Sequence, residues 1–301
     1  MDVFINLLKV ILLGIVEGIT EWLPVSSTAH MLLVNEFVKL NVSPGFMEVF
    51  LVVIQLGAVL AVLVLFWNYL WPFHIRKLTP KQKHIIEKKP AWIRPYYTFT
   101  EKYCSKAKWI LWSKIILACI PTIIIAIPFD DYINEHLNNY MVLSIALIFY
   151  GILFILVEDH VKGSTPTVRN LNALTYRDAL IIGLFQVLAV IPGTSRSGAT
   201  IIGALLIGIS RIVAVEFTFF LAIPVMMGAS LLKLVKFGFG LTAVEAVYLL
   251  CGCLVAFMVS LLVIRVLLRY IKNHDFKVFG WYRIILGTVV LLYFGFLKGG
   301  F

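Results

Sequence analysis

Residues 46–67 have the sequence FMEVFLVVIQLGAVLAVLVLFW, in which Glu48 is the single charged side chain. An α-helix rises about 1.5 Å per residue, so this stretch is long enough to cross the hydrocarbon core of a bilayer. The same bias extends over the whole chain, since 61% of its 301 residues are hydrophobic and 14% are charged, against about 45–50% and about 25% in soluble domains. The composition excludes a soluble enzyme and predicts an all-α polytopic membrane protein.

Five more stretches are apolar enough to form transmembrane helices. Each approaches or exceeds the about 20 residues that a span requires. They are residues 109–128, 140–157, 212–235, 243–268 and 284–298. We therefore expect six transmembrane helices in a single membrane domain that covers residues 1–301.

Two further apolar regions are interrupted by polar residues near their middle. Residues 3–40 are interrupted by Glu17, Glu21 and His30, and residues 179–209 are interrupted by Pro192 and Arg196. Chain of this polarity does not face lipid, but it can line a cavity inside the protein. We therefore predict that each region forms two half-helices joined by a loop, a re-entrant helical hairpin.

Basic residues are concentrated in three of the connecting segments. Residues 68–108 hold ten Lys and Arg with two acids, residues 158–177 and 269–283 are also basic, and residues 129–139 carry acids without Lys or Arg. Six spans and two hairpins put the three basic segments on one side, which the positive-inside rule makes cytoplasmic, with both termini outside. Most of the net charge of +10 is therefore a topology signal, and we expect no nucleic-acid partner. Binding of anionic lipid headgroups by the basic cytoplasmic loop 68–108 is an alternative interpretation.

The two interrupted regions resemble each other. Residues 14–17 (GIVE) match residues 183–186 (GLFQ), and the loops and apolar helices that follow match in the same order. Residues 1–158 and residues 172–301 would each contain one hairpin and three spans. Three is an odd number, so the second unit starts on the opposite side of the membrane. This pattern predicts an inverted-topology repeat, in which two broken helices build a site near the bilayer midplane.

The first interruption, residues 17–30, has the sequence EGITEWLPVSSTAH. Glu17 and Glu21 lie four residues apart and so share a helix face, where they can hold a divalent cation such as Mg²⁺ or Ca²⁺. Ser27 lies within one helical turn of His30, which makes a nucleophile and a base possible. Ser26, Ser27 and Thr28 can cap the next half-helix, whose N-terminus attracts anions. The alternative is that these groups only hydrogen-bond one another and hold two helices together.

The second interruption, residues 192–200, has the sequence PGTSRSGAT. Glycines at 193 and 198 allow a close approach of the backbone, and a guanidinium at 196 can bind phosphate with two hydrogen bonds. The hydroxyl donors are Ser195, Ser197 and Thr200. We predict that this loop, with Gly193, Gly198 and Arg196, forms a phosphate cradle at a helix N-terminus. An ion pair between Arg196 and Glu17 or Glu21 is the alternative role for the arginine.

Together these groups point to hydrolysis of a phosphate on a lipid. Ser27 would attack the phosphorus with His30 as its base or orienting partner; His30 or an activated water are alternative nucleophiles. Glu17 and Glu21 would hold the cation or relay the proton, and Arg196 would stabilise the charge of the transition state. Glu216, which is close to Arg211 in the sequence, is interpreted as part of a structural pair, and participation in the site is the alternative.

The two motifs, EGITEWLPVSSTAH at 17–30 and PGTSRSGAT at 192–200, resemble the two signature motifs of the bacterial undecaprenyl-pyrophosphate phosphatase family, also called the bacitracin-resistance family. The similarity extends to Val53-Ile-Gln55-Leu-Gly57 and to Tyr282-Arg283, and so covers nearly the whole chain. The resemblance implies removal of the terminal phosphate from undecaprenyl diphosphate, which regenerates the lipid carrier of cell-wall synthesis. It also implies a multi-pass protein of the bacterial cell membrane, an outward-facing site, a divalent cation and an inverted-repeat fold.

By position, the resemblance assigns the acidic pair to Glu17 and Glu21, the essential serine to Ser27 and the histidine to His30. It assigns the phosphate-binding loop to residues 195–200. A polyprenyl-phosphate flippase is the main alternative function, because inverted repeats with broken helices are typical of transporters; a passive membrane scaffold leaves the buried acids unexplained. The expected partners are the lipid substrate, membrane lipid and, as a possibility, a second copy of the chain.

Overall fold

The computed structural model describes residues 2–238 and 240–297, and these residues form helices without any strand. Two isolated β-bridges, Phe73 with Cys104 and Val168 with Ile209, are the only extended pairs among them. The helices are α1 (Asp2–Thr20), α2 (Ser27–Val38), α3 (Phe46–Leu65), α4 (Trp67–Leu70), α5 (Pro80–Glu87), α6 (Arg94–Tyr103), α7 (Lys106–His136), α8 (Tyr140–Val161), η1 (Leu171–Ala173), α9 (Tyr176–Val187), η2 (Leu188–Val190), α10 (Arg196–Leu206), α11 (Arg211–Phe237), α12 (Ala243–Tyr270), α13 (Lys277–Leu292) and η3 (Tyr293–Leu297).

Seven of these helices are long and apolar enough to cross a membrane, within the part of the chain that the structure describes. This bears out the all-helical, multi-pass architecture, but the prediction of six such helices was one too few. The additional helix is α1, which belongs to the region predicted as the first hairpin. Its helix continues through Glu17 to Thr20, because Glu17 is buried among protein side chains and does not interrupt an apolar outer face.

Each interrupted region consists of two helices separated by a short break. In the first region α1 ends at Thr20 and α2 begins at Ser27; in the second, α9 and η2 end at Val190 and α10 begins at Arg196. A proline lies in each break, Pro24 and Pro192, where its missing N–H and fixed φ prevent one continuous helix. The two helices of each region pack against each other.

The main packing contacts join helices that are distant in sequence. Helix α12 packs against α1 and α3, α7 packs against α9 and α11, α3 packs against α11, and α8 packs against α13. Several contacts are close because a glycine lies at the crossing: a Cβ on Gly57 of α3 would come within 2.0 Å of the Cys253 carbonyl oxygen of α12. A Cβ on Gly183 of α9 would come within 2.2 Å of the Ala118 oxygen of α7. Small residues let backbones approach in this way in membrane helix pairs.

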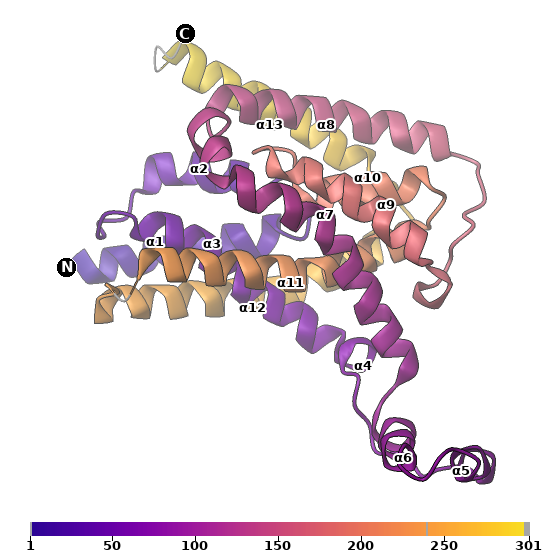
Figure 1. Ribbon diagram of the computed structural model, residues 1–301. Helices are drawn as coiled ribbons and strands as arrows, with labels where there is room; N and C mark the ends of the chain where they lie inside the picture. Colours follow the sequence, from indigo (N-terminus) through magenta and orange to yellow (C-terminus); the bar gives the residue numbers. More distant parts are fainter. Residues whose placement is uncertain (1, 239, 298–301) are drawn as a thin grey trace.

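The two ends of the bundle differ in character (Figure 1). The N-terminus, the C-terminal helix end and the loop between α2 and α3 lie at one end. The loop that contains η1 lies at the other end, and helices α5 and α6 project from there, away from the bundle. The basic segments around residues 68–108, 158–177 and 269–277 therefore gather at the end opposite the termini, as the charge pattern predicts.

We predict that Gly57→Ala destabilises the bundle, because the new methyl group overlaps the α12 backbone at Cys253 and forces α3 and α12 apart. Overpacking of this kind costs about 1–3 kcal/mol. The measurement is the thermal unfolding midpoint of the purified protein in detergent. The control is Gly228→Ala in α11, where a Cβ meets no atom within 4 Å and the midpoint should not fall. Equal midpoints for the two variants would contradict the close approach at Gly57.

Candidate functional site

The two breaks meet inside the bundle, and each holds a serine in a strained backbone conformation. Ser26 has φ of 70° and Ser195 has φ of 69°, and they are the only non-glycine residues with positive φ in the described ranges. A side chain in this region costs of order 1–3 kcal/mol and is found mainly at functional sites. Each serine directly precedes a helix, α2 or α10. The N-termini of α2 and α10 therefore lie at one cavity, which both helix starts line. The free amide groups of a helix N-terminus favour anions.

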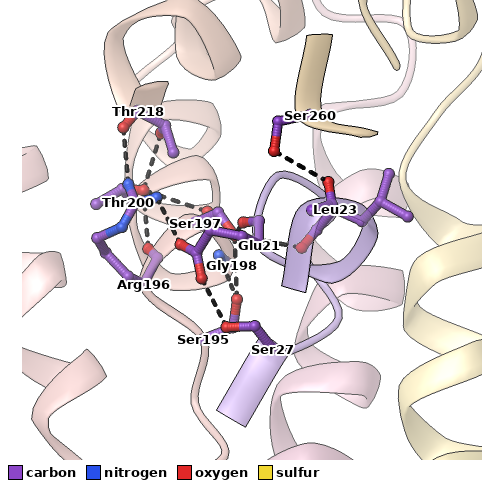
Figure 2. A network of polar contacts seen from close by, with 11 residues as sticks. Glu21, Leu23, Ser27, Ser195, Arg196, Ser197, Gly198, Thr200, Thr218 and Ser260 are labelled. Carbon is purple, nitrogen blue, oxygen red and sulfur yellow. Dashed lines mark hydrogen bonds and ion pairs between the residues drawn. The ribbon is translucent and has the colours of Figure 1, made fainter. Parts of the chain in front are cut away.

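An ion pair connects the two breaks. Arg196 Nη2 donates to Glu21 Oε1 at 3.0 Å, and the two side chains are 10% and 7% exposed. The second carboxylate oxygen, Oε2, accepts a hydrogen bond from Ser27 Oγ at 2.6 Å. Glu21 thus lies between the serine of the first break and the arginine of the second (Figure 2). The predicted ion pair between Arg196 and an acid of the first motif is present, and its partner is Glu21.

The remaining bonds of the arginine loop hold its shape. Arg196 Nη1 donates to the Thr218 carbonyl oxygen of α11 at 2.8 Å. Ser195 Oγ accepts from the Gly198 N–H and lies 3.1 Å from Ser197 Oγ. Thr200 Oγ1 donates to the Arg196 carbonyl oxygen and lies 2.8 Å from Thr218 Oγ1 (Figure 2). The guanidinium of Arg196 is therefore directed across the gap towards Glu21 by α10 and α11.

His30 does not contact Ser27 through either ring nitrogen. Its Nδ1 lies 2.8 Å from the Ser26 carbonyl oxygen, and its Nε2 lies 2.7 Å from the hydroxyl of Tyr282 in α13. A carbonyl only accepts, so Nδ1 carries the proton and Nε2 accepts from the tyrosine. The rings of His30 and Tyr282 are parallel, with centroids 5.6 Å apart. The structure therefore brings Ser27 to Glu21 and not to the histidine that the sequence spacing favoured.

Two adjoining cavities lie beside this network. The inner one, of about 190 Å³, is lined by Glu21, Ser27 and Arg196, and also by three polar residues from other helices, Gln55, Thr122 and Gln186. The outer one, of about 660 Å³, is lined by Glu17, by residues of α2, α3 and the last turns of α11, and by Gly45 and Asn138 from the loops. Thr28 and Gln55 belong to the walls of both. The site therefore opens towards the end of the bundle that holds the termini.

The predicted site residues differ in their position relative to these cavities: some line the inner cavity, Glu17 lines the outer one, and four line neither. Those that line the inner cavity are Glu21, Ser26, Ser27, Thr28, Gly193, Ser195 and Arg196. Glu17 lines the outer cavity. Ser197, Gly198, Thr200 and His30 lie outside both linings and contact the loops from behind. Ser197 and Thr200, for example, bond to backbone oxygens of Glu21 and Arg196, and so help to hold these two cavity residues in position.

Arg283 of α13 is a site residue to which the sequence pattern assigned no role. Its side chain is fully buried, and it donates to the Pro24 oxygen of the first break at 3.2 Å. It also donates to the oxygens of Gly193 and Thr194 in the second break, at 2.8 and 2.9 Å. Counting Arg283 with the basic segment 269–283 was therefore wrong. Two signals pointed to this residue: its position at the start of an apolar span, and the resemblance of Tyr282-Arg283 to the family.

The acidic pair suits a divalent cation. Glu17 is 1% exposed, and no hydrogen-bond partner among the described residues reaches its Oε1. Carboxylate oxygens are the ligands that Mg²⁺ and Ca²⁺ prefer, and one or two carboxylates with substrate phosphate form a common Mg²⁺ site. The described residues contain no group of three or more His, Cys, Asp and Glu side chains that could hold a metal. A donor set of two carboxylates fits such a cation only when phosphate oxygens complete it, and in this structure both oxygens of Glu21 bond to Ser27 and Arg196.

The pairing of Arg211 differs from the sequence interpretation. Arg211 forms its ion pair with Glu158 of α8, whose Oε1 also accepts from the Phe276 N–H. Glu216 is not part of this contact. The Arg211–Glu158 pair joins the end of α8 to the start of α11, and the bond to the Phe276 N–H connects both to the start of α13.

The comparisons with known proteins cover nearly the whole chain. An undecaprenyl-diphosphatase of Enterococcus faecalis is 56% identical over 289 residues, which is 96% of this chain and 97% of that protein. An undecaprenyl-diphosphatase of Lachnoclostridium phytofermentans is 57% identical over 291 residues, with 97% and 98% covered. The family described as bacitracin resistance protein BacA matches residues 10–289. The motifs, the buried site between the two breaks and these matches agree, and the chain belongs to the bacitracin resistance protein BacA family.

Proposed function

We propose that this protein hydrolyses undecaprenyl diphosphate to undecaprenyl phosphate and inorganic phosphate, and thereby recycles the lipid carrier of cell-wall synthesis. The relatives named undecaprenyl-diphosphatase support the substrate and the reaction. The observation that carries the chemistry is the short contact between Ser27 Oγ and Glu21 Oε2, 2.6 Å, beside Arg196. A hydroxyl bonded to a carboxylate, next to a guanidinium and two helix N-termini, is suited to attack on phosphate.

In the first step Ser27 Oγ attacks the terminal phosphorus, and its proton passes to Glu21. The bond from that phosphorus to the bridging oxygen breaks, and undecaprenyl phosphate leaves with the electron pair. Water then cleaves the phosphoserine and releases inorganic phosphate, while Glu21 returns the proton to Ser27. Before the attack, the guanidinium of Arg196 releases the Glu21 carboxylate and binds the phosphate oxygens of the substrate instead. Glu21 is then free to act as the base.

Two other residues position the reacting groups. Arg283 joins the backbone oxygens of both breaks and so sets the separation of Ser27 and Arg196. His30 holds the Ser26 carbonyl and the Tyr282 hydroxyl, which orients the first turn of α2. A shift of about 1 Å in such a constellation can lower a rate by about 10²-fold.

We propose that a divalent cation, Mg²⁺ or Ca²⁺, binds to Glu17 and Glu21. The unpartnered Oε1 of Glu17 and the all-oxygen donor set support this assignment. When bound, the cation would neutralise charge on the phosphate oxygens. Glu17 contributes its carboxylate, and its burial keeps that carboxylate aimed at the substrate.

We propose that α1–α2 and α9–α10 are re-entrant hairpins of an inverted repeat formed by residues 1–158 and 172–301. The nearly equal φ angles of Ser26 and Ser195 support this arrangement. The packing supports it too, since α1 packs on α12 as α9 packs on α7, the helices that correspond in the two halves. Because the cavities open towards the termini and the basic segments lie at the other end, the positive-inside rule favours an outward-facing site in the cell membrane.

A flippase is less well supported, because the relatives are named for the hydrolase activity. Hydrolysis and transport are separated by phosphate release in detergent, where no second compartment exists. A homodimer stays a prediction and is not needed for the site, since one chain provides all the groups named above.

We predict that Ser27→Ala and Glu21→Gln each lower the rate of phosphate release from undecaprenyl diphosphate in detergent by at least about 10²-fold. The first removes the nucleophile and the second the proton acceptor, and a positioned base alone contributes about 10²–10⁴-fold. A rapid-quench experiment with labelled terminal phosphate should trap label on Ser27. The control is Ser164→Ala, an exposed serine at the other end of the bundle, with an unchanged rate. Wild-type rates for Ser27→Ala would contradict the mechanism.

We predict that Arg283→Lys lowers kcat by about 10²-fold with a smaller change in KM, because an ammonium cannot hold the oxygens of both breaks at once. The control is Arg265→Lys at an exposed position of α12, which should keep the wild-type kcat. Gly57→Ala serves as a second control, since it should be less stable but retain its kcat. If Arg283→Lys lost only stability, the positioning role would be wrong.

We predict that removal of divalent cations by a chelator abolishes phosphate release and that Mg²⁺ or Ca²⁺ restores it. In Glu17→Gln the cation concentration for half-maximal activity should rise about tenfold or more, the range in which single changes around a metal alter its affinity. Glu48→Gln, an exposed acid at the rim of the outer cavity, is the control. An unchanged half-activation concentration in Glu17→Gln would remove Glu17 from the cation site.

A further inference from the structure

Residues 72–104 form an arm that takes no part in the site. The arm contains α5 and α6 and projects sideways from the bundle, beyond the start of α7 (Figure 1). We propose that this arm lies on the membrane surface at the end of the bundle opposite the termini and binds the headgroups of anionic phospholipids. The inference concerns a surface far from the cavities and does not depend on the proposed reaction.

Four exposed aromatic side chains contact one another in a row at the place where the arm leaves the bundle. Trp67 stacks on Trp71 with centroids 4.4 Å apart, Phe73 contacts Trp71, and Trp109 contacts Phe73. All four are between 43% and 48% exposed. Exposed tryptophans at the end of an apolar helix are typical of the boundary between hydrocarbon and headgroups. The arm therefore begins at headgroup depth.

Hydrogen bonds at the place where the arm joins the bundle set the direction of the arm. The Ser105 N–H donates to the Pro72 oxygen at 2.8 Å, and Lys108 Nζ donates to the Trp71 oxygen at 2.9 Å. Farther out, the N–H groups of His74 and Arg76 donate to the oxygens of Tyr103 and Lys102, both at 2.9 Å. The two segments of chain that enter and leave the arm are thus hydrogen-bonded to each other, and the arm extends sideways from the bundle (Figure 1).

The charge of the arm is complementary to an anionic surface. It holds eight Lys and Arg and two acids, and one of those acids, Glu101, accepts a hydrogen bond from Gln82. Most of the basic side chains are exposed, and they are distributed over both helices and the connecting turns. The basic residues are Arg76, Lys77, Lys81, Lys83, Lys88, Lys89, Arg94 and Lys102. Clusters of this size next to a transmembrane helix bind anionic headgroups.

The arm also presents large aromatic side chains that remain mostly exposed, although Tyr96 and Phe99 contact the neighbouring rings of Tyr97 and Tyr103. Helix α6 has ten residues and none of them is buried. Tyr96 and Phe99, three residues apart on one face, are 63% and 52% exposed, and Trp92 before the helix is 82% exposed. A helix this short is marginal in water by itself. Aromatic rings beside basic groups are the composition of helices that lie in the membrane interface, where the rings enter the acyl boundary.

The test is hydrogen–deuterium exchange of the full-length protein in nanodiscs of phosphatidylcholine with and without phosphatidylglycerol. Amides of α5 and α6 should exchange at least about tenfold more slowly when the anionic lipid is present, a change that the attraction of one or two basic side chains can produce. A five-glutamine variant removes most of the charge of the arm, with the substitutions Lys81→Gln, Lys83→Gln, Lys88→Gln, Lys89→Gln and Arg94→Gln. Its exchange in the arm should be the same in both nanodiscs.

The matched control has glutamine at Lys162, Arg169 and Lys272, exposed basic residues outside the arm, and should keep the protection by phosphatidylglycerol. The thermal unfolding midpoint of each variant in detergent verifies the fold. Equal exchange of the wild-type arm in the two nanodiscs would overturn the proposal. So would protection that survives in the five-glutamine variant, or protection that appears only when a protein extract is added, which would identify a protein partner.

Discussion

The ion pair between Glu21 and Arg196 is the contact on which the interior of this protein depends. Either charge alone, in a bundle that is mostly hydrocarbon, would carry a large desolvation penalty. The two charges are paired at 3.0 Å, and Ser27 and the Thr218 oxygen provide further hydrogen bonds, while Arg196 Nε has no hydrogen-bond partner among the described residues. Because the partners come from separate breaks, satisfying the charges requires the two breaks to meet.

Arg283 of α13 also holds the two breaks together, because it bonds to backbone oxygens of both. Its guanidinium lies above the ring of Tyr150 and donates to carbonyl oxygens that the broken helices leave without intrahelical partners. The strain at Ser26 and Ser195 is held in place by this framework. Two helix N-termini, the guanidinium of Arg196 at the cavity and that of Arg283 behind it surround Glu21, and this arrangement of positive groups is suited to an anionic diphosphate.

The sequence was sufficient for the helical class and for the residues at the centre of the site, because Glu21, Ser27 and Arg196 stand out as polar groups inside apolar runs. It was not sufficient for contacts between distant residues. Helical spacing favours a contact between Ser27 and His30, but the imidazole turns to Tyr282, a residue 252 positions away. The inward turn of Arg283 and the uninterrupted helix α1 were missed for the same reason, since both depend on which neighbours the final packing provides.

The packing of α12 against both α1 and α3 has a consequence for how the protein is made. While the ribosome is still synthesising the chain, α1 and α3 enter the membrane with their small-residue faces, at Gly14 and Gly57, open towards the place where α12 will insert later. The first half of the chain therefore enters the bilayer with Glu21 unpaired, because its partner Arg196 is synthesised later. We therefore expect insertion to depend on a chaperone that covers polar helices at the translocon. A chain that ends before α12, which starts at Ala243, should be degraded by membrane proteases.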